Sequence, residues 1–139
     1  MTFELKNDNF TLMTKELLTN LGYKVIKEQH HIENNKNSIA LCVEFKSNIF
    51  LKPPYSPNDF TFIDCKVEQL VGDKYIQNLK SLVDVANTNE NYTKRIGGRI
   101  GGGIFLYNGS GEHIPQEMID LGLPNRIFCW DLHRIFFYT

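Results

Sequence analysis

An aspartate and a lysine stand two residues apart in an apolar stretch, Phe60-Thr61-Phe62-Ile63-Asp64-Cys65-Lys66-Val67. Side chains alternate between the two faces of a strand, so Asp64 and Lys66 are expected on one face and the apolar residues between and around them on the other. Inside a sheet, a charge without a partner costs free energy. The pair therefore indicates either a chemical site or a structural ion pair on a partly hydrated face.

A carboxylate and a lysine at this spacing can support hydrolysis of a phosphodiester bond. Carboxylate oxygens are suitable ligands for Mg²⁺ or Mn²⁺, and the bound ion polarises the phosphate and lowers the pKa of a bound water. A lysine can position that water or neutralise charge that develops on the phosphate. In this scheme Asp64 and a second carboxylate hold the metal, and Lys66 acts on the water and the phosphate.

The second carboxylate has more than one candidate. Glu44 is preferred, because a hairpin through the proline-rich segment would place residues 44–46 opposite residues 64–66. Asp59 is the alternative, although it stands at an odd offset from Asp64. Both alternatives stay open at this point.

The first half of the chain reads as one helix followed by strands. Asp8 or Asn9 can cap the helix and Gly22 can end it. The polar stretch after the first strand is expected to be a loop, with His30 and His31 at the surface. The expected elements are a helix over residues 9–21, a strand over 23–29, a loop over 30–37, an extended segment over 38–51, a connection over 53–58 and a strand over 60–67.

The second half alternates helices and strands. Its strongest pattern is the helical apolar spacing of residues 73–86. The other expected elements are a polar, partly basic loop over 87–99, a strand over 104–107, a short helix over 115–121 and a strand over 127–130. This order predicts an α/β fold with a central mixed β-sheet flanked by helices.

Composition limits the class of protein. The chain has 139 residues and a net charge of -1, which fits one domain over residues 1–139 and argues against a wholly basic surface. The aromatic end of the chain also fits one domain of a longer protein. No apolar run is long enough to cross a bilayer, and the first residues do not resemble a secretion signal, so a cytoplasmic location is expected. The three dispersed cysteines are expected to be reduced core residues.

A basic and glycine-rich stretch, Lys94-Arg95-Ile96-Gly97-Gly98-Arg99, precedes the strand over 104–107. Glycines let backbone amides approach phosphates, and the basic side chains can pair with them. The stretch lacks the lysine and hydroxyl residue that end a P-loop, and it precedes a strand rather than following one. The loop from Asn91 to Arg99 is therefore expected to contact the backbone of DNA through Lys94, Arg95 and Arg99.

The Asp64-Cys65-Lys66 motif resembles the (D/E)xK half-motif of the PD-(D/E)xK nuclease superfamily. Residues 17–25 resemble the first helix and strand of Mrr-type restriction endonucleases and archaeal Holliday-junction resolvases, and residues 103–108 and 127–132 resemble later core strands. The resemblance implies a restriction-endonuclease-like αβββαβ core and Mg²⁺-dependent endonucleolytic cleavage of DNA by Glu44, Asp64 and Lys66. Some relatives also use a glutamate of the first helix, where Glu16, off the apolar stripe, is the candidate. A homodimer fits this activity, because nucleases that act on both strands are commonly dimers. Two alternatives stay open: a degenerate copy that binds nucleic acid or a protein without cutting, and an assembly domain with no role on nucleic acid.

Overall fold

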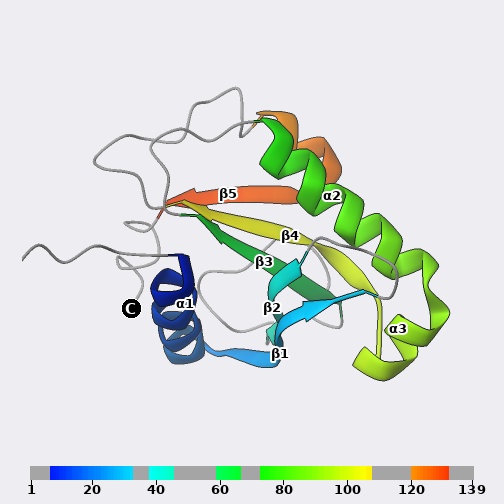
Figure 1. Cartoon of the computed structure of the whole chain (residues 1–139), viewed down its shortest axis with the longest axis horizontal. Coiled ribbons are helices and arrows are strands. Elements are labelled where there is room, and N and C mark those ends of the chain that lie inside the picture. The colour runs from blue at the N-terminus through cyan, green and yellow to red at the C-terminus, as the bar shows by residue number, and fades with distance from the viewer. Residues whose placement is uncertain (1–6, 33–37, 46–58, 67–72, 108–119, 132–139) are drawn as a thin grey trace, which may run out of the picture.

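A five-stranded mixed sheet forms the centre of the computed structural model, which describes residues 7–32, 38–45, 59–66, 73–107 and 120–131. α1 covers one face of the sheet and α2 covers the other (Figure 1). The predicted α/β fold is therefore confirmed. The elements are α1 (Asn7–Leu21), β1 (Tyr23–His31), β2 (Ser38–Phe45), β3 (Phe60–Lys66), α2 (Asp73–Thr88), α3 (Glu90–Ile96), β4 (Ile100–Tyr107), the 3₁₀ turn η1 (Leu123–Asn125) and β5 (Ile127–Asp131).

The strands lie in the order β1-β2-β3-β4-β5. β1, β2 and β3 pair antiparallel, whereas β3, β4 and β5 pair parallel. Parallel neighbours need a crossover connection, and α2 with α3 supplies it between β3 and β4. As a result, β3, β4 and β5 all end at the same edge of the sheet.

The first predicted helix is confirmed, with an earlier start. α1 begins at Asn7, so Asp8 and Asn9 lie inside its first turn and the predicted caps are wrong. Gly22 ends the helix as predicted: its φ is 104° and its amide donates to the carbonyl oxygen of Thr19 at 3.1 Å. The left-handed conformation is one that glycine adopts at little cost.

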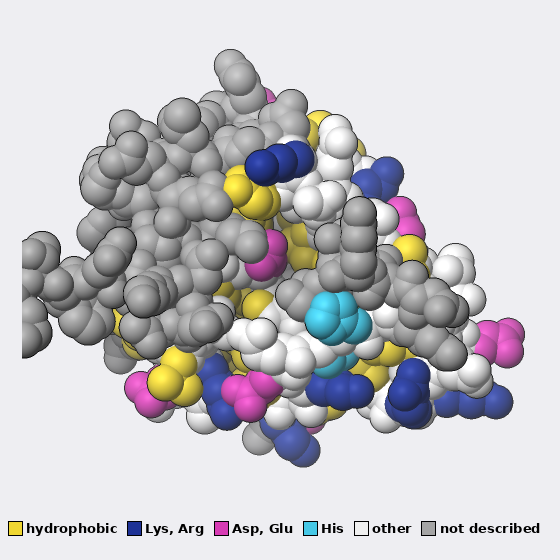
Figure 2. All heavy atoms as spheres, viewed as in Figure 1, with side chains coloured by type: hydrophobic (Ala, Val, Ile, Leu, Met, Phe, Trp, Pro, Cys, Tyr) yellow, Lys and Arg dark blue, Asp and Glu magenta, His cyan; other side chains and the backbone are white. Residues whose placement is uncertain are grey.

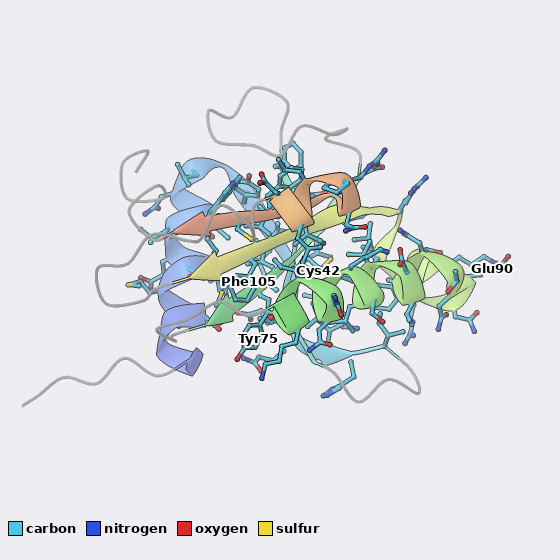
Figure 3. The ribbon with its side chains drawn as sticks, turned by 90° about the horizontal axis from the view of Figure 1, so that it is seen from above. Cys42, Tyr75, Glu90 and Phe105 are labelled. Atoms are coloured by element: carbon cyan, nitrogen blue, oxygen red, sulfur yellow. The ribbon has the colours of Figure 1, made fainter. Side chains whose placement is uncertain are left out.

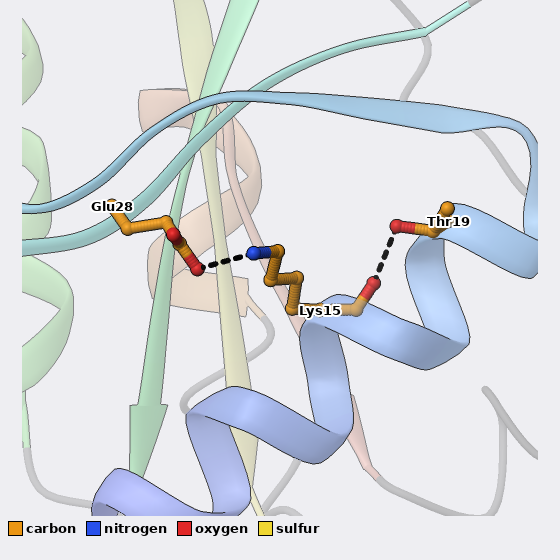
Figure 4. Close-up of polar contacts among 3 residues, drawn as sticks. All are labelled: Lys15, Thr19 and Glu28. Carbon is orange, nitrogen blue, oxygen red and sulfur yellow. Dashed lines mark hydrogen bonds and ion pairs between the residues drawn. The ribbon is translucent and has the colours of Figure 1, made fainter.

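α1 is held on the sheet mainly by apolar packing. Buried Leu18 packs with apolar residues of the sheet, among them Leu41 and Ile63. Lys15 also pairs with Glu28 of β1 at 2.9 Å (Figure 4), but these side chains are 37% and 47% exposed. An ion pair this exposed contributes at most about 1 kcal/mol. The position of α1 is therefore determined by its buried stripe.

α2 confirms the predicted helix and packs on the opposite face. Its buried side chains contact Phe62, Phe105 and Ile127 of the sheet, and they are Ile76, Leu79, Leu82, Val83 and Ala86. A Cβ built on Gly103 would lie 2.9 Å from Leu79, so the glycine allows close contact between the helix and β4. β4 accordingly begins at Ile100, four residues before the predicted strand, because the glycine run lies in the sheet beneath α2.

The predicted loop over 87–99 is wrong in part, because it contains the helix α3. The side chain of Asn89 accepts a hydrogen bond from the amide of Tyr92 at 3.1 Å, which caps the start of the helix. Gly97, with a φ of 100°, ends it, and its amide donates to the carbonyl oxygen of Thr93 at 2.8 Å. Capping can define a helix too short to show a clear apolar period.

Three other predictions concern the ends of elements. β1 extends to His31; His31 is exposed as expected, but His30 is only 8% exposed, so its predicted surface position is wrong. The predicted segments 46–51, 53–58 and 115–119 lie outside the described residues. Residues 120–122 are helical and lead into η1, and β5 confirms the predicted strand over 127–130.

Candidate functional site

Asp64 lies near the end of β3, on the sheet face that α2 covers. It is half-buried and pairs in register with Phe105 of β4. One row further on, Lys66 pairs with Tyr107, and Tyr107 pairs with Asp131 of β5. These positions are at the carboxyl ends of three parallel strands, where α/β sheets commonly bind ligands.

The register of β2 on β3 does not bring Glu44 to Asp64. Leu41 pairs with Ile63 and Val43 pairs with Thr61, so the predicted pairing of 44–46 with 64–66 is wrong. The described part of β2 is Ser38–Phe45, and the predicted extension over 46–51 lies outside the described residues. Continuing the observed register places Glu44 opposite Phe60.

The consequence is a wide separation between the two predicted metal ligands. Four strand positions separate Glu44 from the place opposite Asp64, which corresponds to about 13 Å along the strand. Ala40 is the residue of β2 that follows Leu41 toward Asp64, and it has no carboxylate. Glu44 instead lies 3.8 Å from the ammonium group of Lys24. In this register Glu44 and Asp64 do not fit as two ligands of one Mg²⁺.

The other two candidate acids are also distant from Asp64. Asp59 precedes the first residue of β3, at the opposite end of that strand. Glu16 is exposed on α1, which packs on the face of the sheet that carries Ile63 rather than Asp64. Within the ranges that the structure describes, no group of three His, Cys, Asp or Glu side chains could hold a metal ion.

A second candidate site is a groove at the other end of β3. It has a volume of about 640 Å³ and is open to solvent. Its lining combines the end of α2, the second half of α3 and the turn into β4, and consists of Asn87, Thr93, Lys94, Gly97, Gly98 and Arg99. We call this feature the basic groove. Basic side chains follow the lower edge of the molecule in Figure 2, over β1 and α3.

The basic groove includes two of the three predicted DNA contacts. Lys94 and Arg99 line it and both are exposed. Arg95 is also exposed but is not part of the lining, and its Nε donates to the carbonyl oxygen of Asn91 at 3.4 Å. In the last turn of α3, Lys94 therefore lines the groove, whereas Arg95 does not.

Backbone contacts fix the shape of the basic groove. Asn87 holds Ile100 through two hydrogen bonds of 2.9 Å: its Nδ2 donates to the carbonyl oxygen, and its Oδ1 accepts from the amide. The carbonyl oxygen of Arg99 accepts from the amide of Phe60 at 2.8 Å. A Cβ built on Gly97 would meet nothing within 4 Å, so the groove is uncrowded there, while the amide of Gly97 donates within the cap of α3.

The basic groove and Asp64 lie at opposite ends of β3. Phe60 pairs with Ile100 at the groove, whereas Asp64 pairs with Phe105 four residues further along, which corresponds to about 13 Å. Figure 3 shows the same separation: Tyr75 and Phe105 lie together near the start of α2, and Glu90 lies at the far end of the α2–α3 layer. The predicted DNA contacts are thus not adjacent to the predicted metal ligand.

A buried polar contact behind the basic groove was not predicted. Nε2 of His30 lies 2.6 Å from the hydroxyl of Tyr92, and the two rings are stacked, with centroids 5.8 Å apart and an interplanar angle of 3°. The edge of Phe62 packs against both rings. No described group bonds to Nδ1 of His30. The capping signals of Asn89 and Gly97 could have revealed the helix that carries Tyr92.

The surroundings of this contact disfavour the charged forms of both His30 and Tyr92. Burial, then the nearby Lys27 and His31, lowers the pKa of His30 from 6.5 to about 4. Burial, with the Cys42 thiol as a smaller contribution, raises the pKa of Tyr92 above its usual value. Burial also raises the pKa of Cys42 to about 12; Cys42 and Cys65 are buried, as predicted, whereas Cys129 is half-buried. The contact is therefore uncharged at neutral pH.

Two further findings complete the description. None of the described helices is sufficiently long and apolar to cross a membrane. Comparison with protein-family models, curated proteins and solved structures finds no match to this chain. Membership of the PD-(D/E)xK superfamily therefore stays a prediction from the sequence motif and the order of elements.

Proposed function

We propose that this chain is a nucleic-acid-binding domain with a restriction-endonuclease-like core, and that it binds the phosphate backbone of DNA without cutting it. The order α1-β1-β2-β3-α2-β4 supports this core, because it is the αβββαβ order of that fold. The observation that carries the binding proposal is that the exposed cations Lys94 and Arg99 line one groove, which is uncrowded at Gly97.

The lining of the basic groove favours phosphate over bases. The described side chains that line it are two cations, an amide and a hydroxyl, and none of these described residues is aromatic. Contacts to phosphate position a protein on nucleic acid but do not read sequence, whereas preference for exposed bases commonly depends on aromatic stacking. The proposed binding is therefore electrostatic, independent of sequence and sensitive to salt.

The geometry around Asp64 favours binding without cleavage. Glu44 stands four strand positions from the place opposite Asp64, and Ala40 stands nearest to that place on β2. Cleavage of a phosphodiester with a divalent metal relies on several oxygen ligands around the ion. Asp64 has no such companion from Glu44, Asp59 or Glu16.

Salt-dependent binding tests the proposal. Fluorescence anisotropy of a labelled duplex of random sequence would be measured from about 50 to 300 mM salt, for wild type and for Lys94→Gln/Arg99→Gln. Each lost phosphate contact lowers the magnitude of the slope of log K against log salt by about 0.9, so the double variant should lose about 1.8. A matched control, Lys74→Gln/Lys80→Gln, removes two exposed charges of α2 outside the groove and should keep the wild-type slope.

A purely structural role of the same cations is separable from binding. Lys94 lies in the last turn of α3, where a cation also interacts favourably with the helix dipole, by about 0.3–1 kcal/mol. Thermal unfolding of each variant would measure that contribution independently. Equal slopes for the groove variant and its control, with both proteins folded, would contradict the binding proposal.

A metal-dependent endonuclease is the second candidate function. The feature that favours it is the position of Asp64 and Lys66 at the carboxyl ends of three parallel strands, with Asp131 in the same register row as Lys66. Nicking of supercoiled plasmid in Mg²⁺ or Mn²⁺ would be compared for wild type, Asp64→Asn and Lys66→Met. Nicking by wild type that both folded variants lose would replace the binding proposal with this one.

A further inference from the structure

The basic groove depends on α3, which presents a single buried side chain to the rest of the molecule. α3 has seven residues, and Tyr92 is its buried residue, with 2% of its surface exposed. Tyr92 packs on Phe62 of β3 and hydrogen-bonds His30 of β1. Thr93 and Lys94, which line the groove, follow Tyr92 directly.

The backbone beside His30 is unusual. Gln29 has a φ of 38°, in the left-handed region that side chains other than glycine rarely adopt. The register of β1 on β2 also shifts between Val25 and Lys27. A residue held in such a conformation costs about 1–3 kcal/mol and persists where the surrounding structure imposes it. Here the unusual backbone at Gln29 directly precedes His30, whose side chain lies inside the core rather than in solvent.

We propose that His30 and Tyr92 form an acid-sensitive latch that positions α3, so that protonation of His30 releases α3 from the sheet and weakens binding at the basic groove. This inference rests on the proposed function. His30 and Tyr92 are positioning residues in it, since neither lines the groove.

The surroundings of His30 explain the direction of the effect. Among the described residues, the ionisable groups near the contact are Lys27 and His31 on β1, Cys42 on β2, and Tyr92 and Arg95 on α3. Phe62 adds only an apolar surface from β3. None of these described neighbours is a carboxylate. A protonated His30 therefore meets cationic and apolar groups while docked, and it gains water when α3 moves away.

The size of the effect follows from linkage. A histidine in water has a pKa of 6.5, which is the upper limit for His30 after release, and burial lowers the pKa of docked His30 to about 4. Between about pH 7.5 and pH 5, the ratio of released to docked α3 should therefore rise about 30-fold at most. The predicted loss of affinity on acidification is opposite in sign to ordinary binding of a polyanion, which strengthens as side chains gain protons.

Native-state hydrogen exchange tests the latch directly. Protection of the amides of α3 (Glu90–Ile96) and of α2 would be followed from about pH 7.5 to pH 5, corrected for intrinsic exchange, with DNA affinity measured in parallel. Amides of α3 should exchange at a lower free energy of opening than those of α2, because α3 is released without global unfolding. Protection in α3 should fall by up to about 30-fold, and affinity should fall with it. Exchange of α3 only together with α2, at the same free energy of opening at every pH, or unchanged protection in α3, would overturn the latch.

A variant of His30 and an NMR titration of the wild type complete the test. His30→Gln keeps an amide that can hydrogen-bond the hydroxyl of Tyr92 but does not titrate, so its α3 protection and its affinity should no longer fall with acid. If this variant does not fold, NMR of the wild type decides: the His30 ring and the Gly97 amide must then titrate with one midpoint. Absence of DNA binding at every pH would overturn the proposed function, whereas the exchange result judges the latch alone.

Discussion

Asn87 offers the sharpest test of how the basic groove is built. Its side chain joins the end of α2 to the first residue of β4 through two hydrogen bonds of 2.9 Å to the backbone of Ile100. Ile100 is only 1% exposed, so its amide and carbonyl groups have little access to water. Asn87→Ala removes both bonds and leaves both groups of Ile100 without these partners.

The cost can be worked from these contacts. A buried backbone group that loses its partner costs about 1–3 kcal/mol. Asn87 is itself half-buried, so a water molecule can replace part of each bond, and we expect a total loss of about 2–3 kcal/mol. With a urea m-value of about 2 kcal/mol/M, the midpoint of unfolding should fall by about 1–1.5 M.

Urea unfolding followed by tryptophan fluorescence is the suitable assay, since Trp130 is the single tryptophan and is 5% exposed. Asn87→Asp is a useful comparison, because it keeps the acceptor for the Ile100 amide but places a carboxylate oxygen against the Ile100 carbonyl oxygen. It should lose at least as much stability as Asn87→Ala at neutral pH. A loss below about 0.5 kcal/mol for Asn87→Ala would refute the view that this side chain supports the start of β4.

Two further predictions concern the helix–sheet contact and the buried histidine. Gly103→Ala brings a methyl group within 2.9 Å of Leu79, so unfolding by heat should show a loss of about 1–3 kcal/mol, which shortening Leu79 should partly restore. Stability should also depend on pH through His30: because its pKa is lowered to about 4 in the folded chain, its contribution is fully present above pH 6.5 and is lost as the pH falls toward 4. Since the Lys27 part is screened by solvent, about 1–2 kcal/mol should disappear between pH 7.5 and pH 5, and His30→Gln should not show this loss.

Local patterns in the sequence predicted the larger elements. α1, α2 and β5 follow the predicted ranges closely because each carries an apolar period that only one conformation can bury. The alternation in β3 was also readable: Ile63 and Cys65 pack on the α1 face, and Phe62 packs on the α2 face. The resulting α/β order needed no information from distant residues.

The register in which the strands pair could not be predicted from the sequence in the same way. The same alternation in β2 is compatible with registers that differ by two residues, and only the observed pairing of Leu41 with Ile63 shows which one is adopted. That single choice separates Glu44 from Asp64. It converts a plausible pair of metal ligands into two distant acids, one of which lies beside Lys24.

The sequence by itself determined which segments are helices and strands, because apolar periodicity and capping residues act over a few neighbouring positions. Only the tertiary structure decided which side chains meet. His30 and Tyr92 are 62 residues apart in the chain, yet they share a hydrogen bond, and Lys94 and Arg99 meet across a turn that α3 creates. Such contacts depend on register and on how a short helix docks, and both are fixed by burial summed over the whole sheet rather than by any local pattern.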